Sequence, residues 1–214
     1  MIIDAVCVGM FQVNCYLLAD ESAGIGVLVD PGDEGESILE MIRGHGVNVS
    51  DILITHSHLD HVGALDEVRD ALGARVHMNP KELPMFERVP AQGLAFGLRM
   101  RQPRAPEEEL IDDQVLQLGG LAIRVIETPG HSPGGVCLLL EQPGRLLLTG
   151  DTLFAGGIGR TDLWGGSYDQ LIDSIKKRLL SLDDDLAVYP GHGPPTTIGE
   201  ERRNNPFLQD GLQW

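Results

Sequence analysis

His56, His58, Asp60 and His61 lie within six residues of one another, directly after the strand-like run Asp51–Thr55. In an extended segment, side chains two residues apart point to the same side, so His56 and His58 can bind one metal ion together. Apolar residues recur at helical spacing after His61, and an aspartate suits the positive start of a helix. A purely structural explanation, in which Asp60 caps that helix, leaves the three histidines unexplained. The segment therefore predicts a metal site at the end of a strand.

Two further histidines occur in glycine- and proline-rich turns that follow expected strands. His131 lies in Pro-Gly-His-Ser-Pro-Gly-Gly, and His192 lies in Pro-Gly-His-Gly-Pro-Pro. Asp151 ends the apolar run Leu146–Gly150, where a carboxylate either forms a turn or belongs to a site. Each histidine alone would more often be an ordinary turn residue. Beside the first segment, metal binding becomes the better interpretation, since histidine is the commonest metal ligand.

The pattern of apolar runs predicts two strand-rich halves, each with helices. We expect strands over Ala5–Val8, Cys15–Ala19, Gly26–Val29, Asp51–Thr55, 115–118, 121–127, 136–141, 145–149 and Leu186–Tyr189. Helical spacing appears around residues 38–42, after residue 61, and from Tyr168 to Leu182. Residues 79–113 predict a short helix and a long surface loop that borders the substrate entrance. Two sheets covered by helices make an α/β sandwich, and we expect residues 1–214 to form one domain.

Composition limits the classes of partner. The chain has 32 acidic and 16 basic residues, a net charge of -16, so we expect no nucleic acid partner. No apolar run approaches the roughly 18 residues that span a bilayer, so we expect no membrane contact. The start of the sequence shows no secretory signal, and three cysteines are too few for a disulfide framework. We therefore expect a cytoplasmic protein whose cysteines are buried.

Four motifs together resemble the ordered metal motifs of the metallo-β-lactamase superfamily, and within it the glyoxalase II branch of hydroxyacylglutathione hydrolases. They are Thr-His-Ser-His-Leu-Asp-His, Pro-Gly-His-Ser-Pro-Gly, Thr-Gly-Asp-Thr-Leu-Phe and Tyr-Pro-Gly-His-Gly. The resemblance implies an αββα four-layer sandwich with the site at one edge. It also implies two sets of metal ligands, with Asp151 bridging the two ions together with a water or hydroxide. The first set is His56, His58 and His131, and the second is Asp60, His61 and His192.

The same resemblance implies hydrolysis of a small-molecule thioester, S-lactoylglutathione to D-lactate and glutathione. Asp60 would be the catalytic residue, because it would both bind metal and orient the attacking hydroxide. Zinc is the expected metal, since it lowers the pKa of bound water to about 7. Iron and manganese accept the same ligands and stay open. The sequence does not indicate the oligomeric state.

The sequence departs from glyoxalase II at its glutathione site. That family carries a helical C-terminal extension, which this sequence lacks, so it is most similar to the short form of the branch. Where the family usually has a lysine and a tyrosine facing glutathione, Arg160 and Asp162 occur here. Arg160 would bind a substrate carboxylate through its guanidinium fork. Equally, Arg160 could pair with Asp162 and stiffen the loop.

Two other functions stay open at this point. The iron-dependent persulfide dioxygenases share much of the pattern, and Gly159-Arg160-Thr161-Asp162 resembles that branch as well. Against it stands the last motif, Pro-Gly-His-Gly, which is the hydrolase version. A catalytically inactive metal-binding module of the same fold is the alternative outside enzymes. Structural zinc sites are usually closed and often contain cysteine, whereas this ligand set contains none.

Overall fold

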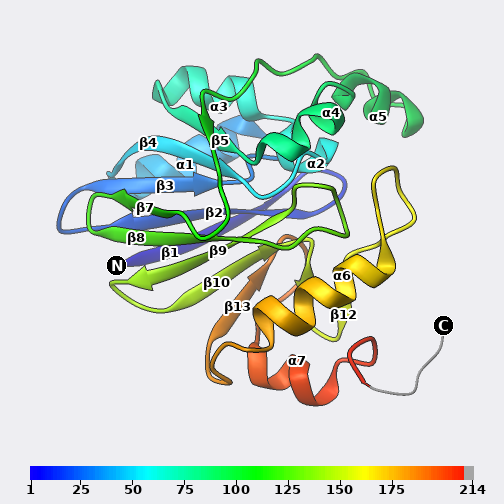
Figure 1. The fold of residues 1–214 in the computed structure, drawn as a ribbon. Coiled ribbons are helices and arrows are strands. Elements are labelled where there is room, and N and C mark those ends of the chain that lie inside the picture. The colour runs from blue at the N-terminus through cyan, green and yellow to red at the C-terminus, as the bar shows by residue number, and fades with distance from the viewer. Residues whose placement is uncertain (210–214) are drawn as a thin grey trace.

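Two six-stranded sheets form the centre of the computed structural model, which describes residues 1–209 (Figure 1). The first sheet has the strand order β1-β2-β3-β4-β5-β6, and the second has the order β14-β13-β10-β9-β8-β7. The first comprises β1 (Ile2–Val8), β2 (Val13–Asp20), β3 (Ile25–Val29), β4 (Asn48–Ile54), β5 (Arg75–Met78) and β6 (Glu108–Glu109). The second comprises β7 (Val115–Leu118), β8 (Leu121–Glu127), β9 (Val136–Gln142), β10 (Leu146–Gly150), β13 (Ala187–Pro190) and β14 (Thr196–Thr197). A small hairpin joins β11 (Leu153–Phe154) to β12 (Gly157–Ile158).

Both sheets combine antiparallel neighbours with parallel crossovers. Strands β1, β2 and β3 pair antiparallel, and β4, β5 and β6 then add in parallel. In the second sheet β7 to β10 pair antiparallel, and β13 adds to β10 in parallel. Parallel neighbours bring the carboxyl ends of their strands to the same edge, which is where such sheets usually bind ligands.

Helices cover the outer face of each sheet (Figure 1). Over the first sheet lie α1 (Gly35–His45), α2 (Leu59–Val62), α3 (Leu65–Leu72), the 3-10 helix η1 (Pro80–Glu82), α4 (Leu83–Phe86) and α5 (Val89–Ala95). Over the second lie α6 (Tyr168–Ser174), the π-helix η2 (Ile175–Leu179) and α7 (Ile198–Asn204). The buried apolar side chains form three clusters, one between the sheets and one under each helical layer. Burial of these clusters stabilises the layers, and the αββα sandwich is confirmed.

The segment after β5 is more ordered than its sequence indicates. Three short helices, η1, α4 and α5, replace the single short helix that we expect, and a loop then leads to β6. Phe86 is 2% exposed and Val89 is fully buried against the first helical layer, so these helices are anchored to the core.

One expectation about the cysteines is wrong. Cys15 and Cys137 are buried, but Cys7 is exposed. Strand β1 lies at the edge of the first sheet beside β2, and alternate side chains of a strand face opposite sides. Val6 and Val8 pack against the core on one side of β1, whereas Ala5 and Cys7 on the other side are exposed. None of the helices within residues 1–209 combines the length and the hydropathy needed to cross a bilayer.

Candidate metal centre

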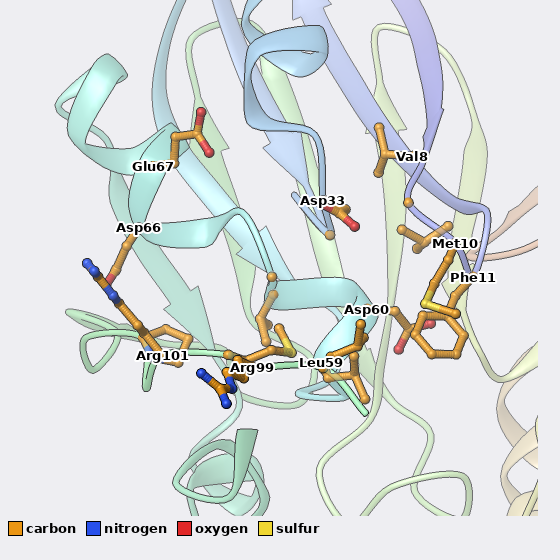
Figure 2. Close-up of a pocket in the computed structure, with 18 of the residues that line it drawn as sticks. Val8, Met10, Phe11, Asp33, Leu59, Asp60, Asp66, Glu67, Arg99 and Arg101 are labelled. Carbon is orange, nitrogen blue, oxygen red and sulfur yellow. The ribbon is translucent and has the colours of Figure 1, made fainter. Parts of the chain in front are cut away.

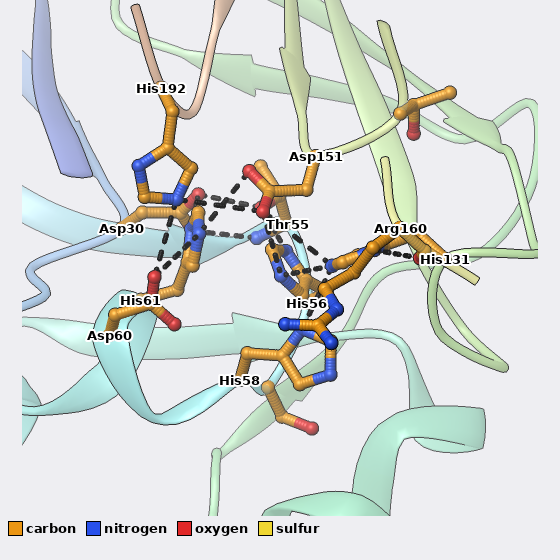
Figure 3. A network of polar contacts seen from close by, with 12 residues as sticks. Asp30, Thr55, His56, His58, Asp60, His61, His131, Asp151, Arg160 and His192 are labelled. Carbon is orange, nitrogen blue, oxygen red and sulfur yellow. Dashed lines mark hydrogen bonds and ion pairs between the residues drawn. The ribbon is translucent and has the colours of Figure 1, made fainter. Parts of the chain in front are cut away.

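Seven side chains from four separate segments meet at one edge of the sandwich (Figure 3). His56 and His58 follow β4, and Asp60 and His61 lie in the first turn of α2. The others come from the second sheet, where His131 follows β8, Asp151 follows β10 and His192 follows β13. The first sheet thus supplies four of the side chains and the second supplies three.

Three imidazoles form the first group. His58 Nδ1 lies 2.8 Å from His131 Nε2, which lies 3.1 Å from His56 Nε2. All three side chains are less than 10% exposed, at 9% for His58, 5% for His131 and 2% for His56. The three nitrogen atoms are close enough to coordinate a single cation.

Asp60, His61 and His192 form the second group. His192 Nε2 lies 3.2 Å from Asp60 Oδ2, and His61 Nε2 lies 3.9 Å from the same oxygen. Asp151 stands between the two groups. Its Oδ2 is 3.6 Å from His131 Nε2 and 3.5 Å from His192 Nε2, while its Oδ1 is 3.4 Å from His61 Nε2. Asp151 is therefore placed to contact cations in both groups.

The outer nitrogens of four imidazoles fix which nitrogen faces the centre. His131 Nδ1 lies 2.7 Å from the Arg160 carbonyl, and His192 Nδ1 lies 3.2 Å from the Gln12 carbonyl. A carbonyl only accepts, so each Nδ1 must carry the proton, and the neutral ring turns the lone pair of Nε2 toward the centre. His61 donates in the same way to Asp30 Oδ2 at 2.9 Å.

His56 completes this arrangement. Its Nδ1 lies 3.0 Å from Thr55 Oγ1, whose own proton goes to Asp30 Oδ2 at 2.6 Å, so Thr55 accepts from the ring. The Nε2 lone pairs of His56 and His131 then face one another. Metal-binding histidines typically donate their other ring proton in this way.

Two buried polar atoms at the centre lack hydrogen bonds. Among the described residues, His61 Nε2 and Asp151 Oδ1 are both fully covered and face one another at 3.4 Å without forming a hydrogen bond. A buried polar atom without a partner costs about 1–3 kcal/mol. Facing lone pairs, an unsatisfied nitrogen and an unsatisfied carboxylate oxygen are all stabilised by a cation. The residues present therefore fit a pair of divalent metal ions.

The pKa shifts of His58 and His61 indicate where positive charge is needed. Burial lowers the pKa of His58 to about 3, and the neighbouring His131 adds to this effect. Burial would also lower the pKa of His61, but Asp151, Asp30 and Asp60 outweigh it and raise that pKa well above the usual range. A proton on His61 thus offsets the carboxylates in the metal-free chain. A bound cation would displace that proton.

The model of the metallo-β-lactamase superfamily matches residues 8–192, which include all seven of these side chains. The chain belongs to this superfamily. A hydroxyacylglutathione hydrolase of Haemophilus influenzae, GloC, is 39% identical over 210 residues, which cover 97% of this chain and 98% of the relative. The similarity thus extends over nearly the full length of that relative.

Two solved structures have the same fold as this chain. The BLEG-1 B3 metallo-β-lactamase superposes with a TM-score of 0.90 at 35% identity, covering 97% of this chain and 99% of the other. The protein TTHA1623, solved in a di-iron-bound form, superposes with a TM-score of 0.87 at 40% identity, covering 96% and 100%. The donor set of this chain, in a fold of the metallo-β-lactamase superfamily, therefore suits divalent metal ions, with the metal's identity open.

Residues that the sequence analysis does not identify also orient the side chains of this candidate metal centre. Asp30, 2% exposed, accepts from the backbone N–H of Thr55 at 2.8 Å as well as from Thr55 Oγ1 and His61 Nδ1. Asp30, His56 and His61 also lie close enough to form a metal-binding group of their own. Since both oxygens of Asp30 already accept these bonds, we assign it to orienting the ligands. Its only sequence signal is the Asp-Pro-Gly turn that closes β3.

Two other contacts fix loops of the centre. Asn14 Nδ2 donates to the Pro190 and Gly193 carbonyls at 3.1 and 3.0 Å, and Tyr16 OH donates to Pro190 at 2.8 Å. Strand β2 of the first sheet thereby holds the turn that carries His192. Glu82, which is fully buried, accepts from Ser57 and from the Gly134 backbone N–H, and so ties two ligand loops together.

Two glycines allow the backbone to pass close to the centre. A Cβ on Gly191 would lie 2.4 Å from Asp151 Oδ1 and 2.8 Å from His61 Cε1. A Cβ on Gly159 would lie 1.9 Å from the Asp151 carbonyl oxygen and 3.0 Å from His131 Nδ1. The motifs therefore need glycine at these positions for space.

Arg160 contributes its backbone to the centre, and its side chain pairs elsewhere. Its guanidinium donates to both carboxylate oxygens of Asp162 at 2.8 Å each, while its carbonyl accepts from His131. Of the two roles that the sequence allows, the pairing with Asp162 is the one present here. Binding of a substrate carboxylate by Arg160 stays a prediction.

Two clefts of the metallo-β-lactamase fold meet at Leu59 and Asp60. The first, of about 810 Å³, runs past α3 and the loop at 98–103, and acidic side chains line much of it (Figure 2). The second, of about 650 Å³, contains His58, His131, Asp151 and His192 in its wall. It runs between α4–α5 and the segment 154–164, so part of the segment 79–113 lines it. That this cleft is the substrate entrance stays a prediction.

Proposed function

We propose that this metallo-hydrolase hydrolyses thioesters in the manner of glyoxalase II, converting S-lactoylglutathione to D-lactate and glutathione. The observation that carries the proposal is the convergence of histidine lone pairs and the Asp151 carboxylate at the floor of an open cleft. Similarity to the hydroxyacylglutathione hydrolase of Haemophilus influenzae supports the thioester, and the matching family supports a hydrolase. Water would add its hydroxyl group to the acyl carbon while the carbon–sulfur bond breaks and the thiol takes the proton.

In this proposal the chain holds two divalent cations. His56, His58 and His131 would bind one, Asp60, His61 and His192 the other, and Asp151 both. When bound, these cations would lower the pKa of water and polarise the thioester carbonyl. Zinc is the expected metal, and iron is supported by the di-iron form of TTHA1623.

The protein's own residues would orient the reactants. Asp60 is 17% exposed in its side chain and contacts His192, so it can also accept a hydrogen bond from the attacking water. Asp30, Thr55 and the Arg160 carbonyl hold the outer nitrogens of three imidazoles, which fixes the directions of their lone pairs. A departing thiolate needs little protonation, so the mechanism requires no separate acid.

Hydrolysis of S-lactoylglutathione by purified protein, with metal analysis of the same sample, tests this function. Asp60→Ala and Asp151→Ala should each lose bound metal and thioester hydrolysis together, because each removes a charged ligand from the centre. Full activity in either variant would contradict the assignment. Chelated protein should lose activity and regain it when Zn²⁺ is added back.

Two outcomes would favour the alternatives. Oxygen consumption with glutathione persulfide and Fe²⁺, without thioester hydrolysis, would indicate the persulfide dioxygenase. The segment Gly159-Arg160-Thr161-Asp162, which resembles that branch, is the reason to test this reaction. Stoichiometric metal without turnover of either substrate would indicate a binding module.

A further inference from the structure

The cleft that opens onto the metal centre is predominantly apolar. Its walls include Phe96 and Met85 on one side and Leu163 and Trp164 on the other. Trp164 is 52% exposed and Phe96 is 48% exposed, although both are large hydrophobic side chains. Exposed apolar side chains that line a concave site usually contact an apolar part of the ligand. The polar peptide of glutathione would leave this surface uncovered.

The positively charged side chain of Arg88 packs against this apolar wall. The Arg88 guanidinium lies 4.9 Å from the centre of the Trp164 ring, a cation–π contact. Among residues 1–209, no carboxylate pairs with Arg88. Arg160, the other arginine of the cleft, is already neutralised by Asp162. In a chain of net charge -16, an exposed arginine without a carboxylate is available to a ligand.

The neighbouring cleft carries more charged side chains. Asp33, Asp60, Asp66, Glu67 and Asp70 line it against two arginines, in the loop at 98–103. Asp66 and Asp70 pair with Arg104, and the remaining three carboxylates disfavour an anionic ligand. An anionic substrate would therefore reach the centre through the cleft that contains Arg88.

We propose that this apolar cleft selects thioesters that carry an apolar chain ending in a carboxylate. The chain would lie against Trp164 and Phe96, and the carboxylate would pair with Arg88. Arg88 is then a specificity-determining residue, pre-oriented by its stacking on Trp164. The inference rests on the proposed thioester hydrolysis and extends it from S-lactoylglutathione to this class of substrate.

Matched pairs of thioesters test the selection. On the acyl side, the octanoyl thioester of N-acetylcysteamine is compared with the monosuberyl thioester of the same thiol. On the thiol side, the acetyl thioester of octanethiol is compared with that of ω-mercaptooctanoate. In one of the two pairs, the wild type should hydrolyse the carboxylate member with a kcat/KM about threefold to tenfold higher than that of the neutral member. The pair that shows this preference identifies whether the acyl side or the thiol side of the substrate lies in the apolar cleft.

Arg88→Gln should abolish that preference, measured as the ratio of kcat/KM for the two members of the pair. Arg43→Gln is the matched control, because Arg43 is an exposed arginine on α1. It should keep the preference. Equal rates for both members of both pairs in the wild type, or a preference that survives in Arg88→Gln, would overturn the inference.

A binding measurement separates this inference from the proposed function. The sequence has two tryptophans, so Trp214→Phe leaves Trp164 as the only one. Octanoate added to this protein without metal should change its fluorescence, and Arg88→Gln should weaken the apparent affinity by about threefold to tenfold. Octanol should bind both forms equally. If octanoate binding depends on Arg88 but no thioester is hydrolysed, the proposed function fails and the ligand class stands. If thioesters are hydrolysed but Arg88→Gln binds octanoate as tightly as the wild type does, the inference fails.

Discussion

Replacing Glu82 by glutamine should weaken both the fold and the metal centre. Glu82 Oε2 accepts from the Ser57 N–H at 2.7 Å and from Ser57 Oγ at 2.8 Å, and Oε1 accepts from the Gly134 N–H at 2.6 Å. Ser57 lies between His56 and His58, and Gly134 lies in the loop that follows His131. One buried carboxylate thus fixes the spacing of the two loops that provide the first group of imidazoles.

The size of the effect follows from the atoms lost. Glutamine keeps one acceptor oxygen, and its NH₂ group must then face either Ser57 or the Gly134 N–H. One buried donor loses its acceptor and meets another donor, while the remaining bonds lose their charge. An unsatisfied buried donor costs about 1–3 kcal/mol and a bond to a charged group contributes about 1.5–3 kcal/mol. We therefore expect unfolding free energy to fall by about 2–4 kcal/mol.

Urea unfolding of the metal-free protein measures this loss, and competition with a chelator measures metal affinity. The metal affinity should fall by about tenfold to a hundredfold, as for other groups that orient ligands. Glu87→Gln is the matched control, since Glu87 is exposed just after α4, and it should change stability by less than about 0.5 kcal/mol. If Glu82→Gln unfolds and binds metal as Glu87→Gln does, the loops are held by something else and the reasoning is refuted.

Two further predictions concern thiols and pH. Burial raises the pKa of Cys137 to about 11 and raises that of Cys15 well above the usual range, so at pH 8 a disulfide reagent should label one thiol in the folded protein and three after unfolding. Cys7→Ser should leave no fast thiol, and rapid labelling of a second site in that variant would contradict the buried positions. Burial would raise the pKa of Asp112, but hydrogen bonds from Arg178 outweigh burial and lower that pKa. The ion pair of Asp112 with Arg178 therefore stabilises the fold by roughly 1 kcal/mol above about pH 4, and this stabilisation is lost as the pH falls through the folded-state pKa. The difference in unfolding free energy between the metal-free wild type and Asp112→Asn should therefore shrink between pH 6 and pH 3, and a constant difference would count against the ion pair.

The sequence predicts the sandwich because its signals are local. Strands end at glycine- and proline-rich turns, and the histidines and Asp151 follow those strands directly. The seven side chains meet as the motifs imply, although their binding of metal stays a prediction, as does the organisation of residues 1–214 as one domain. Local signals suffice here because the parallel strands bring their carboxyl ends to one edge whatever the loops contain.

The residues that orient this centre leave no such signal. Glu82 ends the short 3-10 helix η1, at a position where a charged residue is normally exposed, and its burial depends on two loops from distant parts of the chain. Arg88 and Trp164 are 76 positions apart, and only the packed structure brings them into contact. The reversed expectation for Cys7 has the same origin, since a run of apolar residues does not reveal which strand lies at the edge.

The origin of the seven side chains has a consequence for how the protein matures. His56, His58, Asp60 and His61 belong to the first sheet, and His131, Asp151 and His192 to the second, so neither half of the polypeptide has a complete set of donors. During synthesis, the earlier half could capture a cation only weakly, with water in the missing positions. Tight binding of the cation would require that the two halves pack together and that β2 forms its hydrogen bonds to the turn at 190–193. A cation bound by ligands from both halves would stabilise their packing, so metal binding would be the last step of folding.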